Sequence, residues 1–311
     1  MPRADSTMVR RALILAPGRS GSTLLQSAFL SSCDALTFFE PCRHSPIGDV
    51  RKDHCVAQVL RFLDCNLPQR NGAWDPPEIK GWLRHPYSEA NTSCTPPPLL
   101  SVEQTAAVCQ QAQLVFVKEI RLVGELSRVA KALAQSERKG ITALIHLVRD
   151  PRPMLASQRR LLWWNMNSEM SRRRRAMEIE RVAKRTCDGM VRDADAGDAL
   201  LRSGQTTYIL VRFEELTSEL EATTLRLYAQ LGRPVLHSTR LWLNRTLAGQ
   251  CSHGNDAANA EKFEYSTCRA RQARRRPQQR WKHVLTMLEK RAISRVCSHA
   301  LARFGYDTAL S

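Results

Sequence analysis

An apolar run, a turn of small residues and a helical pattern follow one another near the start of the chain, and they constrain the fold most. The run Ala12–Ala16 fits a buried strand, and the segment Pro17–Ser22 after it is rich in glycine and serine. Residues Leu24–Leu30 then have the apolar pattern of a helix. Such a junction points several backbone N–H groups at one place, which favours the binding of an anion.

The loop in this junction differs from the usual nucleotide-binding loop. That loop has two glycines separated by four residues and followed by Lys and Ser or Thr, whereas only Arg19 and Ser20 separate Gly18 from Gly21 and no Lys follows. Arg19 adds a fixed positive charge. An ordinary ATP site is therefore disfavoured. A P-loop nucleotide kinase or NTPase stays as an alternative, because its loop also joins a first strand to a helix.

A second junction of strand and helix lies in the middle of the chain. The run Ala143–Val148 is strand-like, Asp150 suits the N-cap of the next helix, and Pro151 suits its first position. Arg149 then ends the strand and Ser157 falls in the second turn of the helix. Both side chains can face a ligand at the carboxyl end of this strand.

Strand-like runs alternate with helical stretches along the chain. The runs are Ala12–Ala16, Leu36–Phe39, Leu114–Val117, Ala143–Val148 and Tyr208–Val211. This alternation predicts an α/β fold with a parallel sheet flanked by helices, with ligands at the carboxyl ends of the strands. We expect one domain over residues 1–311. An insertion at about 43–113, interrupted by prolines, is expected to form short helices such as Val56–Leu63.

The two junctions resemble the donor site of the sulfotransferases. Gly18–Thr23 is similar to their 5′-phosphosulfate loop, and Arg149 with Ser157 resembles their 3′-phosphate site. Further segments, in matching order, resemble the Golgi carbohydrate 6-O-sulfotransferases: Phe39–Pro41, Val117–Leu122, Leu147–Arg152, Val211–Leu216 and Phe304–Tyr306. The resemblance runs from about residue 12 to residue 306. It implies sulfuryl transfer from 3′-phosphoadenosine 5′-phosphosulfate (PAPS) to a galactose, N-acetylgalactosamine or N-acetylglucosamine hydroxyl, the 6-hydroxyl in this family.

The resemblance also implies roles for individual residues. Those expected to bind PAPS are Arg19, Ser20, Gly21, Ser22, Thr23, Arg149, Ser157 and Arg269. The expected catalytic residues are Glu40, Arg19 and Lys118. Glu40 is the expected general base, Arg19 is expected to stabilise the charge that appears on the departing phosphate oxygen, and Lys118 is expected to help hold the sulfuryl group or the acceptor. Arg121 is expected to help hold the sulfuryl group or the acceptor. The scheme needs no metal. Around Arg269 the sequence departs from the family pattern, because Ala270 and Arg271 replace the usual Asn and Ser.

The charge of the chain favours polyanionic partners. Lys and Arg number 47 against 30 Asp and Glu, a net charge of +17. We expect a glycan or glycosaminoglycan acceptor and no dedicated nucleic-acid binding, because zinc-finger, RNA-binding and heptad-flanked basic patterns are absent. The basic run Arg172–Arg175 fits either a solvated helix face or a glycan contact. A catalytically idle, basic glycan-binding protein is a further alternative, against which the joint presence of Arg19, Glu40, Arg149 and Ser157 argues.

Ten cysteines favour an oxidising compartment and structural disulfides over zinc, because closed zinc-ligand spacings are absent. Two sequons, at Asn91 and Asn244, fit a glycoprotein. The resemblance implies the Golgi lumen and a membrane anchor. Since no apolar stretch precedes the first strand, we expect either a truncated catalytic region or a chain that reaches the lumen by another route.

Overall fold

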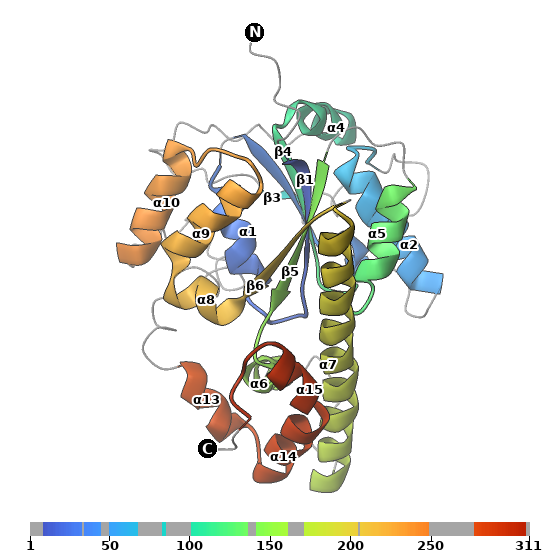
Figure 1. Ribbon diagram of the computed structural model, residues 1–311, viewed down its shortest axis with the longest axis vertical. Coiled ribbons are helices and arrows are strands. Elements are labelled where there is room, and N and C mark those ends of the chain that lie inside the picture. The colour runs from blue at the N-terminus through green and yellow to red at the C-terminus, as the bar shows by residue number, and fades with distance from the viewer. Residues whose placement is uncertain are drawn as a thin grey trace.

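The computed structural model describes residues 9–32, 34–44, 50–67, 83–84, 101–135, 141–160, 171–204, 206–248 and 277–308. Its centre is a six-stranded sheet in the order β3-β2-β4-β1-β5-β6 (Figure 1). Five strands run parallel: β1 (Val9–Leu15), β2 (Ala35–Phe39), β4 (Leu114–Glu119), β5 (Ile141–Val148) and β6 (Thr207–Arg212). Each predicted strand-like run falls in one of them except for Ala16, which directly follows β1, so the predicted parallel sheet is confirmed.

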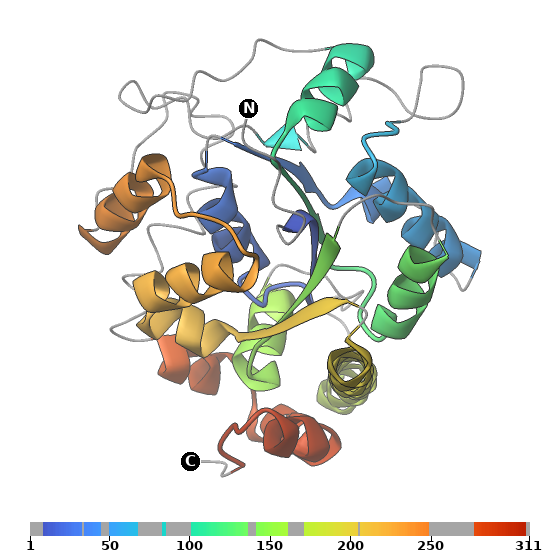
Figure 2. The ribbon, with the colours of Figure 1, turned by 45° about the horizontal axis from the view of Figure 1, so that its top comes forward.

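Helices cover both faces of the sheet (Figure 2). One face packs against α1 (Ser22–Leu30), α8 (Phe213–Ser218), α9 (Leu220–Gln230) and α10 (His237–Ala248), and the other against α2 (Val50–Leu63), α5 (Leu126–Ala134) and α7 (Arg172–Ser203). Successive strand residues alternate between the two layers, so Ile14 and Phe116 face α1 while Leu13 and Val117 face α2. Because both faces are buried, the strands read as unbroken apolar runs.

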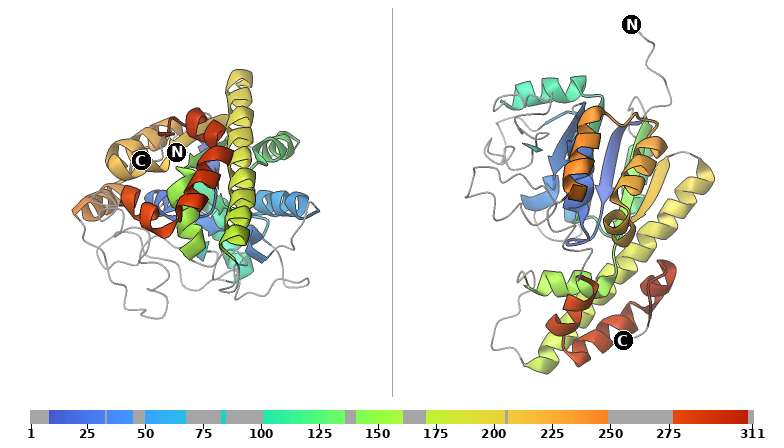
Figure 3. Two further views of the ribbon diagram at one scale, coloured as in Figure 1. Left: turned by 90° about the horizontal axis from the view of Figure 1, so that it is seen from below. Right: turned by 90° about the vertical axis from the view of Figure 1, so that its left-hand side faces the viewer.

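A group of helices lies beyond the carboxyl ends of the strands (Figure 3). The helices are α6 (Pro151–Arg160), α13 (Pro277–Val284), α14 (Met287–Val296) and α15 (Ser298–Arg303). Of these, α6, α14 and α15 pack against α7, and α13 packs against α6. They share a buried cluster that includes Met154, Ile179, Trp281 and Ile293. Since α6 follows β5 directly, this group of helices lies on the side of the sheet where the predicted ligand site lies.

The predicted insertion contains more than short helices. Its described part holds the 3-10 turn η1 (Pro41–His44), α2, β3 (Leu83–Arg84) and α4 (Val102–Gln111). The expected helix at Val56–Leu63 is confirmed as part of α2. Strand β3 pairs antiparallel with β2 and extends the sheet, a feature that the prediction lacked. The assignment of residues 1–311 to one domain stays a prediction.

Candidate active site

The loop after β1 curls tightly against the start of α1. Gly21 is the N-cap of α1 and has a φ of +93°, in the left-handed region that favours glycine. A Cβ at this position would lie 2.2 Å from the ring of Phe213. The first amides of a helix have no partner within the helix, and the first turn of α1 contains no acidic residue. The start of α1 therefore presents backbone donors, and its own first turn offers no carboxylate that would compete for them.

The residues predicted to bind the 3′-phosphate lie directly against this loop. Arg149 Nη1 donates to the carbonyl oxygen of Arg19 at 2.8 Å, and Arg19 Nε donates to Ser157 Oγ at 3.1 Å. The Arg149 guanidinium stacks on the ring of Phe213, 4.1 Å from the ring centroid. Asp150 caps α6 as predicted, since its Oδ1 accepts from the Arg152 N–H at 2.9 Å. The structure thus brings the two strand-helix junctions together.

Two polar atoms in this cluster are buried and have no hydrogen-bond partner among the described residues: Ser20 Oγ and Arg149 Nε. An unpaired buried polar group costs about 1–3 kcal/mol, so a ligand with acceptor atoms would be favoured there. Burial lowers the pKa of Arg149 to about 10, although the Glu214 carboxylate opposes the shift. Arg149 therefore stays positively charged at neutral pH. The donor set fits a ligand with phosphate groups.

A second cluster surrounds Glu40, at the end of β2. Lys118 Nζ lies 2.7 Å from one Glu40 oxygen, and Arg121 Nη1 lies 2.9 Å from the other. Glu40 and Lys118 are 8% and 2% exposed. The parallel register of β2 and β4 explains the contact, because Phe39 pairs with Lys118 and the Glu40 N–H donates to the Lys118 carbonyl at 2.7 Å. The predicted base is therefore held between two cations.

The protonation of Glu40 follows from this environment. Burial alone would raise the pKa of Glu40, but its contacts with Lys118 and Arg121 outweigh burial and lower the pKa below its ordinary value. Glu40 is consequently a carboxylate at neutral pH. Glu40 has a φ of +50°, which is unusual for a residue other than glycine. This left-handed conformation turns the chain sharply at the end of β2.

The two clusters lie at the same edge of the sheet. The phosphate loop follows β1, the Glu40 cluster follows β2 and β4, and Arg149 follows β5, so four neighbouring strands contribute to one region. Arg19, Glu40, Lys118 and Arg149 therefore lie at the carboxyl edge of the sheet, where the sequence predicts that ligands bind. Arg269 lies outside the described residues.

Several residues of the phosphate cluster were not assigned from the sequence. Phe213 contacts both the loop and Arg149, and Gln158 Nε2 donates to the Gly18 carbonyl at 2.7 Å. Glu214 accepts from the Asp150 N–H at 3.1 Å and from the Tyr306 hydroxyl at 3.0 Å. Phe213, Glu214 and Tyr306 lie in segments that carry the resemblance, but their contacts with the site depend on the tertiary fold.

Outside these clusters, Arg212 Nη1 lies 3.8 Å from Glu215 Oε1. On α7, Ile179 and Ala183 are buried and face the core.

The cysteines of the described chain form disulfides. The pairs are Cys42–Cys55, Cys65–Cys109 and Cys187–Cys297. Within the described residues, one group of side chains lies close enough together to bind a metal ion: Cys42, Cys55 and Glu119. Its two sulfur atoms, however, are bonded to each other in a disulfide. The preference for disulfides over zinc is confirmed for these six cysteines. Cys33, Cys94, Cys251 and Cys268 lie outside the described residues.

A parallel sheet with a glycine- and serine-rich loop at its strand ends, beside a carboxylate held by cations, is the arrangement expected of an enzyme that handles a phosphorylated donor. Residues 11–237 match the model of the sulfotransferase family, and the chain belongs to this family. The match confirms the predicted class and leaves the kinase alternative without support. PAPS is accordingly the co-substrate of the family to which the chain belongs.

Relatives with known names are similar over almost the whole chain. Rat carbohydrate sulfotransferase 1 is 24% identical over 96% of this chain and 80% of its own length. Human carbohydrate sulfotransferase 6 is 26% identical over 96% of this chain and 81% of its own length.

Two solved structures resemble the fold. The sulfotransferase domain of the Synechococcus PCC 7002 olefin synthase is 17% identical, with a TM-score of 0.51 and 98% of both chains covered. Sulfotransferase STF9 from Mycobacterium avium is 12% identical, with a TM-score of 0.50, and covers 98% of this chain and 78% of its own. These likenesses support the fold. Among the described helices, none combines the length and the apolar character needed to cross a bilayer.

Proposed function

We propose that this chain transfers the sulfuryl group of PAPS to the 6-hydroxyl of a galactose, N-acetylgalactosamine or N-acetylglucosamine residue in a glycan. The observation that carries the proposal is the contact of Arg19 with both Arg149 and Ser157, which joins the two phosphate motifs into one site. The names of the relatives, carbohydrate sulfotransferases that match 96% of this chain, support a sugar acceptor.

The donor is held at both of its phosphate ends. The amides of Ser20–Thr23 and the Arg19 guanidinium bind the 5′-phosphosulfate, while Arg149 and the Ser157 hydroxyl bind the 3′-phosphate. Ser20 Oγ and Arg149 Nε, both buried and unpaired among the described residues, gain acceptors from these phosphates. Arg269 is proposed to add a contact to the 3′-phosphate.

In the transfer step, the acceptor hydroxyl oxygen attacks sulfur while the bond from sulfur to the phosphate oxygen breaks. The departing oxygen takes the electron pair, so the products are the sulfate ester and 3′,5′-adenosine diphosphate. Glu40 accepts the hydroxyl proton. Arg19 stabilises the negative charge that develops on the departing phosphate oxygen. Fixed cations supply the electrostatic stabilisation, and the scheme uses no metal.

Because Glu40 is ion-paired, its basicity depends on whether the donor PAPS is bound. With Lys118 and Arg121 on either side, proton uptake by Glu40 is unfavourable in the empty site. The negatively charged sulfuryl oxygens compete for the same two cations, which makes Glu40 more basic when PAPS is bound. Proton transfer is therefore favoured in the ternary complex.

The test is a transfer assay that follows sulfate gain by mass spectrometry, with each sugar offered as a 6-hydroxyl form and as its 6-deoxy analogue. The proposal predicts one added sulfate on the 6-hydroxyl form and none on the analogue. Glu40→Gln should lower kcat by about 100-fold or more while the Kd for 3′,5′-adenosine diphosphate changes less than about twofold. Glu221→Gln, at an exposed position of α9, is the matched control and should leave both unchanged. Sulfation of the 6-deoxy analogue would refute the assigned position.

The Golgi lumen is the proposed location. Three disulfides in the described chain support an oxidising compartment, since reduced cytosol disfavours such bonds.

A further inference from the structure

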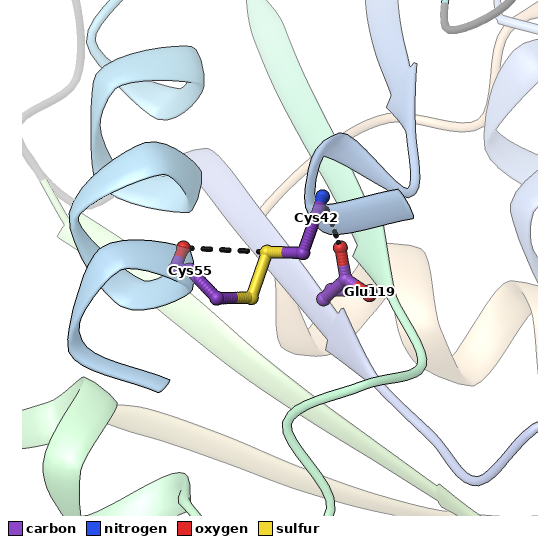
Figure 4. Close-up of side chains that lie close together, drawn as sticks. All are labelled: Cys42, Cys55 and Glu119. Atoms are coloured by element: carbon purple, nitrogen blue, oxygen red, sulfur yellow. Dashed lines mark hydrogen bonds between the residues drawn. A yellow bond between two sulfur atoms is a disulfide. The ribbon is translucent and has the colours of Figure 1, made fainter. Parts of the chain in front are cut away.

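Glu119, the last residue of β4, is a buried carboxylate next to the proposed site and is 0% exposed. Because strand side chains alternate, Glu119 points to the α2 face while its neighbour Lys118 points to the opposite face, where it meets Glu40. The Glu119 carboxylate lies under the turn η1, beside Cys42 (Figure 4). None of the roles given above uses this group.

The Glu119 carboxylate accepts three backbone hydrogen bonds. One oxygen accepts from the Cys42 N–H at 2.8 Å, and the other accepts from the N–H groups of Ile120 and Arg121 at 2.9 and 3.0 Å. The Arg121 guanidinium is 3.4 Å from the second oxygen. Burial raises the pKa of Glu119 although Arg121 and the backbone donors oppose the shift. A carboxylate in this position is costly to bury, and an apolar residue would pack there more cheaply.

The groups that contact the two Glu119 oxygens are each connected to Glu40. Cys42 follows Glu40 by two residues, and Arg121 contacts Glu40 through the same Nη1 that faces Glu119. The left-handed φ of Glu40 is unfavourable for a residue with a side chain, so its surroundings must hold it. The disulfide between Cys42 and Cys55 ties the same turn to α2 (Figure 4). Glu119 thus contacts both the backbone after Glu40 and the cation beside Glu40.

We propose that Glu119 is a positioning residue that orients the Glu40 carboxylate through the Cys42 N–H and the Arg121 guanidinium. The inference rests on the proposed role of Glu40 as the base. It predicts an effect on turnover without an effect on donor binding. The phosphate cluster is held by Phe213 and Gln158, which make no described contact with Glu119.

The test is a double-mutant cycle of Glu119→Gln and Glu40→Gln, measured in the transfer assay and by calorimetric binding of 3′,5′-adenosine diphosphate. Glu119→Gln keeps the shape of the side chain but replaces one acceptor oxygen with a donor. Its kcat should fall about 10- to 100-fold, the cost of a small misplacement of a reacting group, and its Kd should change less than about twofold. In the Glu40→Gln background the same substitution should cost less than about twofold, because the group that it orients is gone.

A matched control is Glu125→Gln, which removes another buried carboxylate. Glu125 is 7% exposed and pairs with Lys52 and Arg128, on the α5 side of the sheet. Its loss should lower stability and leave kcat within about twofold. An equal loss of kcat in this control would show that Glu119 acts through general stability and would overturn the inference.

Three further outcomes would overturn the positioning role: an unchanged kcat in Glu119→Gln, a Kd that weakens as much as kcat falls, or losses that multiply fully in the double variant. If Glu40→Gln alone leaves kcat unchanged, the proposed base fails and the positioning role fails with it. If only Glu119→Gln is without effect, the base stands. Should Glu119→Gln not fold, Glu119→Asp, which keeps the charge on a shorter side chain, enters the same cycle under the same criteria.

Discussion

Replacing Gly21 with alanine would place a methyl group between the phosphate loop and the Phe213 ring. The new Cβ would lie 2.2 Å from a ring carbon, far inside contact distance, so the ring or the loop must move. The backbone φ of +93° adds strain for any residue with a Cβ. Left-handed strain costs roughly 1–2 kcal/mol and overpacking roughly 1–3 kcal/mol. Gly21→Ala should therefore lower the free energy of unfolding by about 2–5 kcal/mol.

Gly204 provides a matched control. It ends α7 with a φ of +65°, and a Cβ there would meet nothing within 4 Å. Gly204→Ala should therefore lose only the strain contribution, roughly 1–2 kcal/mol. The difference between the two variants, measured by urea denaturation, isolates the clash with Phe213.

The clash also has a functional consequence, because Phe213 is the ring on which Arg149 stacks. Displacing the ring removes an aromatic contact that contributes up to about 2 kcal/mol in a desolvated site, so the Kd for 3′,5′-adenosine diphosphate should rise about tenfold. Gly204→Ala should leave this Kd unchanged. Equal stability losses in the two variants, or an unchanged Kd in Gly21→Ala, would refute the account of the loop.

Two further substitutions test other parts of the structure. Arg149→Ala should raise the Kd for 3′,5′-adenosine diphosphate about 10- to 100-fold, as expected for lost charged hydrogen bonds, and calorimetry that finds equal binding would contradict its place at the 3′-phosphate. Asp193 accepts from the Gly124 and Leu126 N–H groups, yet burial raises its pKa from 3.8 to about 7. Between these two pKa values, the folded state therefore keeps a proton that the unfolded state releases. As the pH rises from about 4 to 7, the contribution of Asp193 to the free energy of unfolding falls by roughly 3–5 kcal/mol. Asp193→Asn should flatten this fall in denaturation measured across that range, and an identical pH slope would contradict it.

Much of the framework follows from local patterns. Each parallel strand is an apolar run long enough to be recognised, and Arg149, Asp150 and Pro151 mark the end of a strand and the start of a helix by their residue types. The placement of Arg19, Glu40, Lys118 and Arg149 at one edge then follows from the rule that ligands bind at the carboxyl ends of parallel strands.

Contacts between distant side chains could not be predicted in the same way. In the sequence, Phe213 looks like an ordinary core residue, because phenylalanine is common in protein cores. Only the folded structure shows that it lies against Gly21 and Arg149. Strand β3 has two residues, too few for a pattern, and forms by pairing with β2. Glu119 reads as a charged residue at a strand end, and its buried contacts depend on the turn that follows Glu40. These features arise from tertiary packing, which leaves no local signal.

The central claim, a donor site for PAPS, is tested most directly by calorimetric binding of 3′,5′-adenosine diphosphate against ATP with magnesium on the same protein. The account predicts tight binding of the bisphosphate and none of ATP, because Arg149 and Ser157 are placed for a 3′-phosphate that ATP lacks. Binding of ATP in preference to the bisphosphate, or of neither nucleotide, would contradict it.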